Sequence, residues 1–188
     1  IGMDLSEGGP HVNAVYVAAG DGRSLAESDQ GRPVVIVEQN FADFYGLSPE
    51  RTLRVAGNRE VTSVGIALAP EYFFVMTEEG GFFAEANFAV LFTSLRTAQS
   101  LAGRPDRVND LVITLAPGVD PAAAARDIEG LFAASGTGLG VTVMQTRDED
   151  AYQVLYDDIE GDQRFWNILA GLILAGAAFG AFNLASRM

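Results

Sequence analysis

The closing segment of the chain constrains its fold more than any other feature. Residues 165–185 read FWNILAGLILAGAAFGAFNLA and contain no charged side chain. A helix of twenty-one residues rises about 32 Å, which is enough to cross a hydrocarbon core of about 30 Å. We therefore expect residues 165–188 to form a membrane helix. The alternative is a buried core or oligomer helix, but such helices are usually shorter and keep a polar face. Here only Asn167 and Asn183 are strongly polar.

The charges that flank this segment indicate its orientation. Residues 157–164 are mostly acidic, and the first charge downstream is Arg187. Cationic residues favour the cytoplasmic side of a span, so we expect the C-terminus inside and the preceding domain outside. Aromatic rings favour the headgroup level, which places Phe165 and Trp166 at the outer interface and Arg187 at the inner one.

Small residues recur along the same segment. Such residues let two helix backbones approach closely, and a GxxxG spacing is typical of helix pairs in membranes. We therefore expect this helix to pack against others, with Asn183 either bonding across helices or lying at the interface. The residues predicted to form the packing face are Gly171, Ala175, Gly176, Gly180 and Asn183.

Composition excludes several functions. The chain has 188 residues and a formal net charge of −13, which argues against nucleic-acid binding and against lying flat on anionic lipid. There is no cysteine, so disulfides, thiol catalysis and cysteine-based zinc sites are excluded. There is also no lysine, and a P-loop requires one. The chain therefore cannot itself be a conventional NTPase.

The part before the closing segment reads as an α+β domain of mixed or antiparallel short strands and a few helices, in two subdomains. A continuous apolar run predicts a buried strand at 34–37, and turn signals around residues 57–58 predict a hairpin. The expected strands of the first half are 12–18, 34–37, 52–55, 61–68 and 89–93. The expected helices are 41–45, capped by Asn40 and ended by Gly46, and 94–101, ended by Gly103.

The second half continues the alternation of strands and helices. Leu111, Ile113 and Leu115 predict a strand, and residues 141–144 predict another. Asp120-Pro121 is typical of a helix start. Residues 146–149 have capping-box spacing and open an apolar stripe, so we expect a stalk helix over 147–164 with at most a small kink at Gly161. The expected organisation is a domain at 1–146, the stalk at 147–164 and the membrane helix at 165–188.

No cluster of side chains points to catalysis. His11 is the single histidine and follows a Gly-Pro turn, where a solvated loop residue is the simpler interpretation. The acidic groups at 148–150 and 157–162 lack an EF-hand pattern, and the first is explained by favourable carboxylates at a helix N-terminus. Carboxylate pairs for glycoside chemistry are not ruled out by sequence. We expect no catalytic, cofactor-binding or metal-binding residues, and no cofactor.

One aromatic segment has two interpretations. It contains Tyr72, Phe73, Phe74, Phe82 and Phe83 around the Gly80-Gly81 pair. These rings either pack in the core or form a loop that meets a substrate or a partner protein, because exposed apolar clusters mark interaction sites.

The order of motifs resembles a known family. A Val-rich strand at 33–38 is followed by a short helix, Tyr45-Gly46-Leu47, and a hairpin that ends in VGIALAPEY at 64–72. Asn109–Leu115, Pro117–Asp120 and the alanine-rich helix then follow, and the chain closes on Asn183 and Arg187. This order is similar to that of the extracytoplasmic domain of FtsX-like ABC-transporter permeases, the MacB-like periplasmic core domain. Ser48-Pro49-Glu50 stands where the family often has Gly-Asp, which leaves the subfamily open.

The resemblance implies a function outside the bacterial plasma membrane. It implies a permease of four membrane helices, of which this chain is the loop between the first and second, so we expect a segment of a longer protein. A separate cytoplasmic ABC ATPase would hydrolyse ATP, and a permease homo- or heterodimer in membrane lipid would transmit the motion. The outer domain would engage a lipoprotein, lipid, peptide or drug, or a partner protein. The alternatives are the ligand-sensing domain of a membrane receptor and, third, a membrane-anchored hydrolase.

Overall fold

The computed structural model describes residues 1–72, 88–138, 140–148 and 150–186. The chain divides into two compact units, Ile1–Asp120 and Pro121–Met188. Unit 1 contains a five-stranded sheet with the helices α1 (Gln39–Tyr45) and α2 (Leu95–Ala102). Unit 2 contains α3 (Pro121–Ala134) and α4 (Asp150–Ala185). Four short 3-10 helices complete the described elements: Ser6–Gly8, Glu27–Asp29, Pro70–Tyr72 and Thr146–Asp148.

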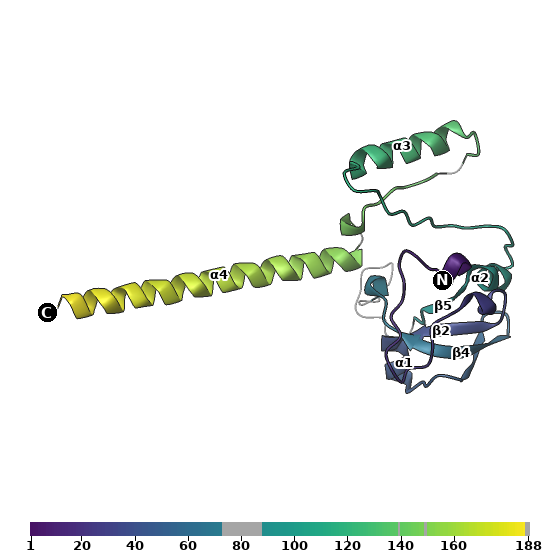
Figure 1. The fold of residues 1–188 in the computed structure, drawn as a ribbon, viewed down its shortest axis with the longest axis horizontal. Coiled ribbons are helices and arrows are strands. Elements are labelled where there is room, and N and C mark those ends of the chain that lie inside the picture. Colours follow the sequence, from purple (N-terminus) through teal and green to yellow (C-terminus); the bar gives the residue numbers. More distant parts are fainter. Residues whose placement is uncertain (73–87, 139, 149, 187–188) are drawn as a thin grey trace. The chain divides into compact units, whose positions relative to one another are not determined.

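The sheet is mixed and runs in the order β1-β5-β2-β4-β3. Its strands are β1 (Gly2–Met3), β2 (Val34–Glu38), β3 (Thr52–Val55), β4 (Arg59–Ala67) and β5 (Leu91–Ser94). The pairs β1–β5 and β2–β4 are parallel, whereas β2–β5 and β3–β4 are antiparallel. Figure 1 shows β2, β4 and β5 side by side at the centre of unit 1. The predicted α+β class with short, mixed strands is therefore confirmed.

Strand β2 lies at the centre of the core and is buried along its whole length. Side chains alternate across a strand, so Val34 and Ile36 pack on one face of the sheet and Val37 on the other. The first face carries the larger cluster, with Leu5, Leu25 and Phe92. The continuous apolar run in the sequence thus reports burial on both faces, as predicted.

The start of α1 differs from the sequence-based expectation. The side chain of Glu38, not that of Asn40, caps the helix, because the carboxylate accepts hydrogen bonds from the backbone N–H of Asn40 at 3.0 Å and of Phe41 at 3.1 Å. A carboxylate at this position satisfies free N–H groups and faces the positive end of the helix dipole. The predicted end is confirmed, since Gly46 has a φ of 60° and stops the helix in the left-handed conformation.

Three predicted strands are wrong. The segment 12–18 makes a single bridge, in which Tyr16 exchanges hydrogen bonds with Leu68 at 2.8 and 2.9 Å. Residues 111–115 and 141–144 are not strands, and Leu111 and Met144 are exposed. Alternating apolar residues favour an extended backbone, but a strand also needs a neighbour that accepts and donates its backbone hydrogen bonds. In the described structure no strand pairs with 111–115 or 141–144, and the bridge at Tyr16 is too short to make 12–18 a strand.

Candidate coupling helix and aromatic segment

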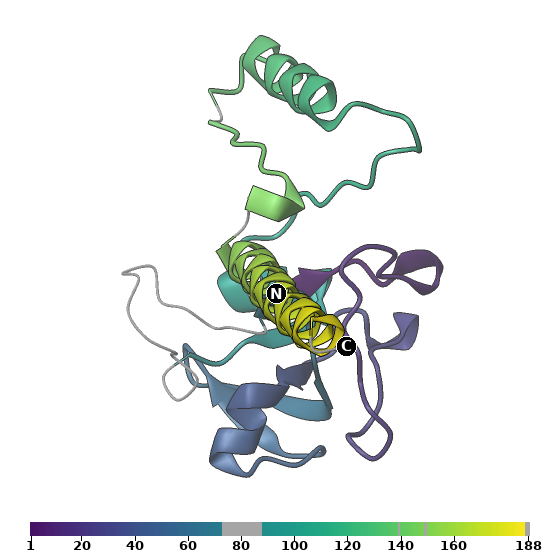
Figure 2. The same cartoon turned by 90° about the vertical axis from the view of Figure 1, so that its left-hand side faces the viewer.

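Helix α4 is the longest element of the chain and the centre of the candidate site. It begins at Asp150, directly after the 3-10 turn Thr146–Asp148, and ends at Ala185. Figures 1 and 2 show it as one unbroken helix that passes Gly161 without a break. The sequence permits this length because it contains no proline between these residues. The helix expected from residue 147 begins at Asp150 and is continuous past Gly161, and the assignment of 147–164 as a stalk stays a prediction.

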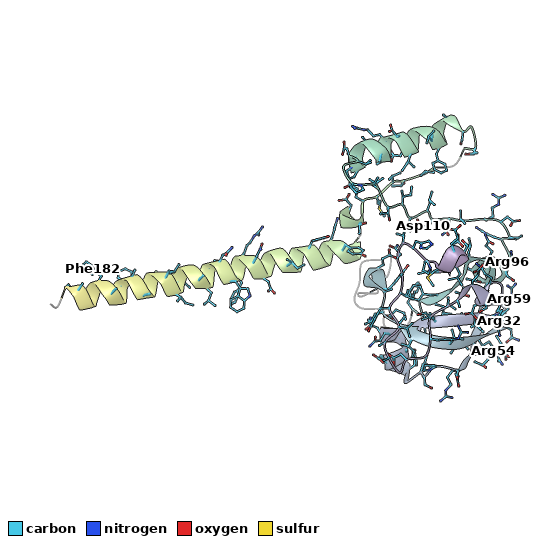
Figure 3. All side chains as sticks on the ribbon, in the orientation of Figure 1. Arg32, Arg54, Arg59, Arg96, Asp110 and Phe182 are labelled. Atoms are coloured by element: carbon cyan, nitrogen blue, oxygen red, sulfur yellow. The ribbon has the colours of Figure 1, made fainter. Side chains whose placement is uncertain are left out.

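Large apolar side chains on the second half of α4 are exposed (Figure 3). Phe165 and Trp166, predicted at the membrane interface, are 60% and 61% exposed and stack edge to face, with ring centroids 5.7 Å apart. The other exposed members are Ile168, Leu172, Ile173, Leu174, Phe179 and Phe182. Covering one such side chain gains about 1.5–3 kcal/mol. These exposed side chains therefore favour contact of this half of the helix with another apolar protein surface or with an apolar medium.

Among the residues that the structure describes, no helix is both long enough and apolar enough to cross a membrane. The predicted membrane helix at 165–188 is therefore not supported by the structure. Arg187, predicted at the inner interface, lies outside the described residues.

The small residues of α4 leave open space beside the helix. A Cβ atom built on Gly171 or on Gly176 has no neighbouring atom within 4 Å, and Ala175 is exposed. The backbone at this face is therefore accessible to another helix. The side chains at positions 180 and 183 lie outside the described part of the structure. Packing of this face against a second helix stays a prediction.

The aromatic segment is only partly described. Tyr72 closes the turn Pro70–Tyr72, and its N–H donates to the carbonyl of Ala69 at 3.0 Å. Its ring packs edge to face against Phe92 at 5.8 Å between centroids. Tyr72 therefore contributes to the core of unit 1. The partner-loop prediction for Phe73, Phe74, Phe82 and Phe83 lies outside the described residues.

Two buried carboxylates, which the sequence did not single out, have structural roles. Glu38 caps α1, and Asp29 is fully buried beside Arg23. Hydrogen bonds from the Arg23 guanidinium hold the pKa of Asp29 below its ordinary value, although burial acts in the opposite direction. A charged, fully bonded carboxylate is a poor proton acceptor. Asp29 therefore fixes the loop before β2 and is unsuited to general base catalysis.

In the described ranges, no three side chains of histidine, aspartate or glutamate gather in a way that could hold a metal ion. His11 is exposed. Asp150, from the acidic stretch at 148–150, is the first residue of α4, where a carboxylate interacts favourably with the helix dipole.

Comparison with known proteins adds one finding. Residues 2–131 match the family model of the MacB-like periplasmic core domain. The match covers all of unit 1 except Ile1, and it also covers most of α3. No curated protein and no solved structure matches the chain.

Proposed function

The chain belongs to the MacB-like periplasmic core domain family, and on this premise we propose how it works within an ABC-transporter permease. Unit 1 is the extracytoplasmic part that engages a substrate or a partner protein. Helix α4 is the mechanical link between this part and a separate cytoplasmic ATPase. The family match over residues 2–131 is the observation that carries the assignment.

The length and continuity of α4 support the mechanical part of the proposal. A helix of 36 residues extends for about 54 Å, because each residue rises about 1.5 Å. Its backbone hydrogen bonds are continuous past Gly161, so a displacement at one end moves the other. A flexible loop at the same place would absorb that displacement. The helix therefore suits the transmission of a motion over a long distance.

Membrane attachment through residues 165–185 is part of the same proposal. Its support is the absence of charge over these residues and the exposure of Ile168, Leu172 and Phe179. Lipid would cover these side chains without leaving a backbone polar group unpaired, because the N–H and C=O groups of a helix form hydrogen bonds within the helix. The face of Gly171 and Gly176 would then meet a second membrane helix, of the same permease or of its dimer partner.

ATP hydrolysis belongs to a partner subunit in this proposal. The chain lacks lysine, which a P-loop needs to reach the β- and γ-phosphates. The energy for movement must then come from outside this chain. The ATPase, the membrane helices and unit 1 would act in series, with α4 as the shared rigid element.

The experiment inserts either a flexible or a helical segment next to Gly161. The complete permease is reconstituted with its ATPase, and a spin label is attached to Ser28→Cys, an exposed position in a segment without cysteine, after any cysteine elsewhere in the permease has been replaced by serine. A seven-residue Gly/Ser insert should abolish the ATP-dependent change at the label while ATP hydrolysis continues. A seven-residue Ala/Glu/Lys insert adds about two helical turns, keeps the helix faces within about 20° and should preserve the change. Equal responses in both insertion variants would contradict the proposal.

A further inference from the structure

Unit 1 carries an open pocket that is bordered by arginines. The pocket has a volume of about 280 Å³ and lies where the loop before β2, the start of β4 and the helix α2 meet. Figure 3 shows Arg32, Arg54, Arg59 and Arg96 along one edge of unit 1. The lining residues are Gly31, Pro33, Arg59, Glu60, Thr97, Ser100 and Leu101.

Backbone and side-chain contacts position each arginine around this pocket. Arg59 lines the pocket, and its guanidinium donates a hydrogen bond to the carbonyl of Ser100. The stem of Arg96 crosses Gly31, because a Cβ built on that glycine would lie 3.1 Å from Cδ of Arg96. Arg32 follows Gly31, and its carbonyl accepts a hydrogen bond from Oγ1 of Thr97 at 2.7 Å. The three arginines therefore belong to one rim, although they come from three separate segments.

The local charge is opposite to that of the chain. Residues 1–120 contain eight arginines and sixteen carboxylates, a formal charge of −8. Among the described residues, Glu60 is the single carboxylate that lines the pocket, and it pairs with Arg54 at 3.4 Å. Arg32 lies 3.8 Å from Asp29, which already accepts two hydrogen bonds from Arg23. In the described part of the chain, no carboxylate forms an ion pair with Arg59 or Arg96.

The free donors at the pocket suit an oxyanion. The N–H of Gly31 is already bonded to Oγ of Ser94 at 3.1 Å, which leaves the guanidinium groups and the exposed hydroxyl of Ser100. A guanidinium binds a carboxylate through two parallel hydrogen bonds. Pockets for whole ligands have volumes of about 300–1,000 Å³, so this pocket suits one or two side chains. Pro33 and Leu101 add apolar walls.

We propose that this rim binds an acidic segment of a partner protein, with a carboxylate in the pocket between Arg32, Arg59 and Arg96. The inference rests on the proposed function, because it names the chemistry of the partner that unit 1 engages. A protein segment is favoured over an anionic membrane surface by the charge of unit 1. The surrounding carboxylates of unit 1 would repel a broad anionic surface. A short segment interacts mainly with the charges within a Debye length of about 8–10 Å, which here include these arginines.

The test measures peptide binding to the full 188-residue chain. A fluorescein-labelled decamer of alternating glutamate and alanine is titrated at low salt and followed by fluorescence anisotropy. We expect saturable binding that high salt removes. The double variant R59Q/R96Q should bind about tenfold more weakly, because one exposed ion pair contributes up to about fivefold in affinity. The matched control is R51Q, which removes an exposed arginine that does not line the pocket.

Other ligands and the fold are controlled in the same experiment. Inorganic phosphate and phosphatidylglycerol vesicles are titrated as separate probes. No peptide binding, an equal loss in R51Q, or Arg96-dependent binding of phosphate or vesicles without peptide binding would each overturn the proposal. If the R59Q change unfolds the chain, peptide binding is measured with R96Q alone, a variant that breaks no hydrogen bond in the described structure. R96Q should still weaken peptide binding. The assay contains neither ATPase nor membrane, so its failure is distinct from a failure of coupling through α4.

Discussion

Both terminal nitrogens of Arg23 donate hydrogen bonds to the carboxylate of Asp29, Nη1 to Oδ2 at 2.6 Å and Nη2 to Oδ1 at 3.0 Å. The same carboxylate accepts the N–H of Ala26 at 3.0 Å. The backbone N–H of Arg23 donates to the carbonyl of Val64 in β4 at 2.9 Å. This pair therefore joins the loop before β2 to the centre of the sheet and fixes the backbone from which Gly31 and Arg32 reach the pocket.

Removing Arg23 should destabilise unit 1. The side chain of Asp29 is 0% exposed, so Arg23→Gln leaves a buried charge with the N–H of Ala26 and the more distant guanidinium of Arg32. Half of the Arg23 side chain is exposed, and solvent screening reduces the loss to about 1–2 kcal/mol. The loss of stability is measured by urea unfolding, with hydrogen-exchange protection of the amides of β2 and β4 as the signal. The control Arg51→Gln should change the stability by less than about 0.5 kcal/mol, and an equal effect in both variants would contradict the account.

The same pair should make stability depend on acid pH. Arg23 lowers the pKa of Asp29 from its ordinary value of 3.8. A depressed pKa in the folded state gives stability that is complete above 3.8 and is lost as the pH falls through the folded value. The difference in stability between the wild type and Asp29→Asn should therefore be largest near neutral pH and shrink below pH 3.8. Urea midpoints across this range measure it, and a constant difference would count against the ion pair.

A methyl group at Gly65 should disturb the contact between β4 and the loop that carries Arg23. A Cβ built on Gly65 lies 2.5 Å from the carbonyl oxygen of Arg23, a backbone atom that cannot turn away. Gly65→Ala should therefore cost about 1–3 kcal/mol. Gly130→Ala in α3 meets no atom within 4 Å and should instead stabilise its helix by about 0.5–1 kcal/mol. Thermal melts followed by circular dichroism compare the two, and an unchanged melt for Gly65→Ala would refute the close approach.

The small-residue face of α4 can be tested against the opposite face. Gly176→Ile fills the open space beside the backbone and should weaken association with a second helix in a bilayer. Ala178→Ile places the same side chain about 200° around the helix and should leave the association unchanged. A membrane helix-association reporter in cells measures both variants. Equal loss in both would show that bulk alone, rather than this face, determines the result.

The sequence predicts those elements whose cause is local. The apolar run of β2, the β3–β4 hairpin and the end of α1 at Gly46 are confirmed, because burial on both faces, turn residues and a left-handed glycine each leave a signal within a few residues. The start of α3 at Pro121 follows from the same kind of signal. The helical continuity of α4 past Gly161 follows from a periodic stretch without proline.

The remaining features depend on residues that meet only in the folded chain. The parallel pairing of β2 with β4 and the ion pair of Asp29 with Arg23 have no local pattern. Arg59 lines the pocket, and Arg32 and Arg96 lie beside its Gly31, although the three arginines come from three segments; composition alone shows only an acidic chain. The strand predicted from the alternation in 111–115 is wrong for the same reason. The alternation shows that a strand is possible but does not show that a neighbouring strand is present.

Topology in the cell membrane tests the central claim most directly. Residues 1–188 contain no cysteine, so single cysteines can be placed at Ser28 in unit 1 and at Ser186 after α4, both of which are exposed, with any cysteine elsewhere in the complete protein replaced by serine. The complete protein is expressed in bacteria, and spheroplasts are treated with a membrane-impermeant maleimide before and after permeabilisation. An extracytoplasmic permease domain predicts labelling of Ser28→Cys in intact spheroplasts and of Ser186→Cys only after permeabilisation. Equal labelling of both positions in intact spheroplasts, or no labelling of Ser28→Cys until they are opened, would contradict the account.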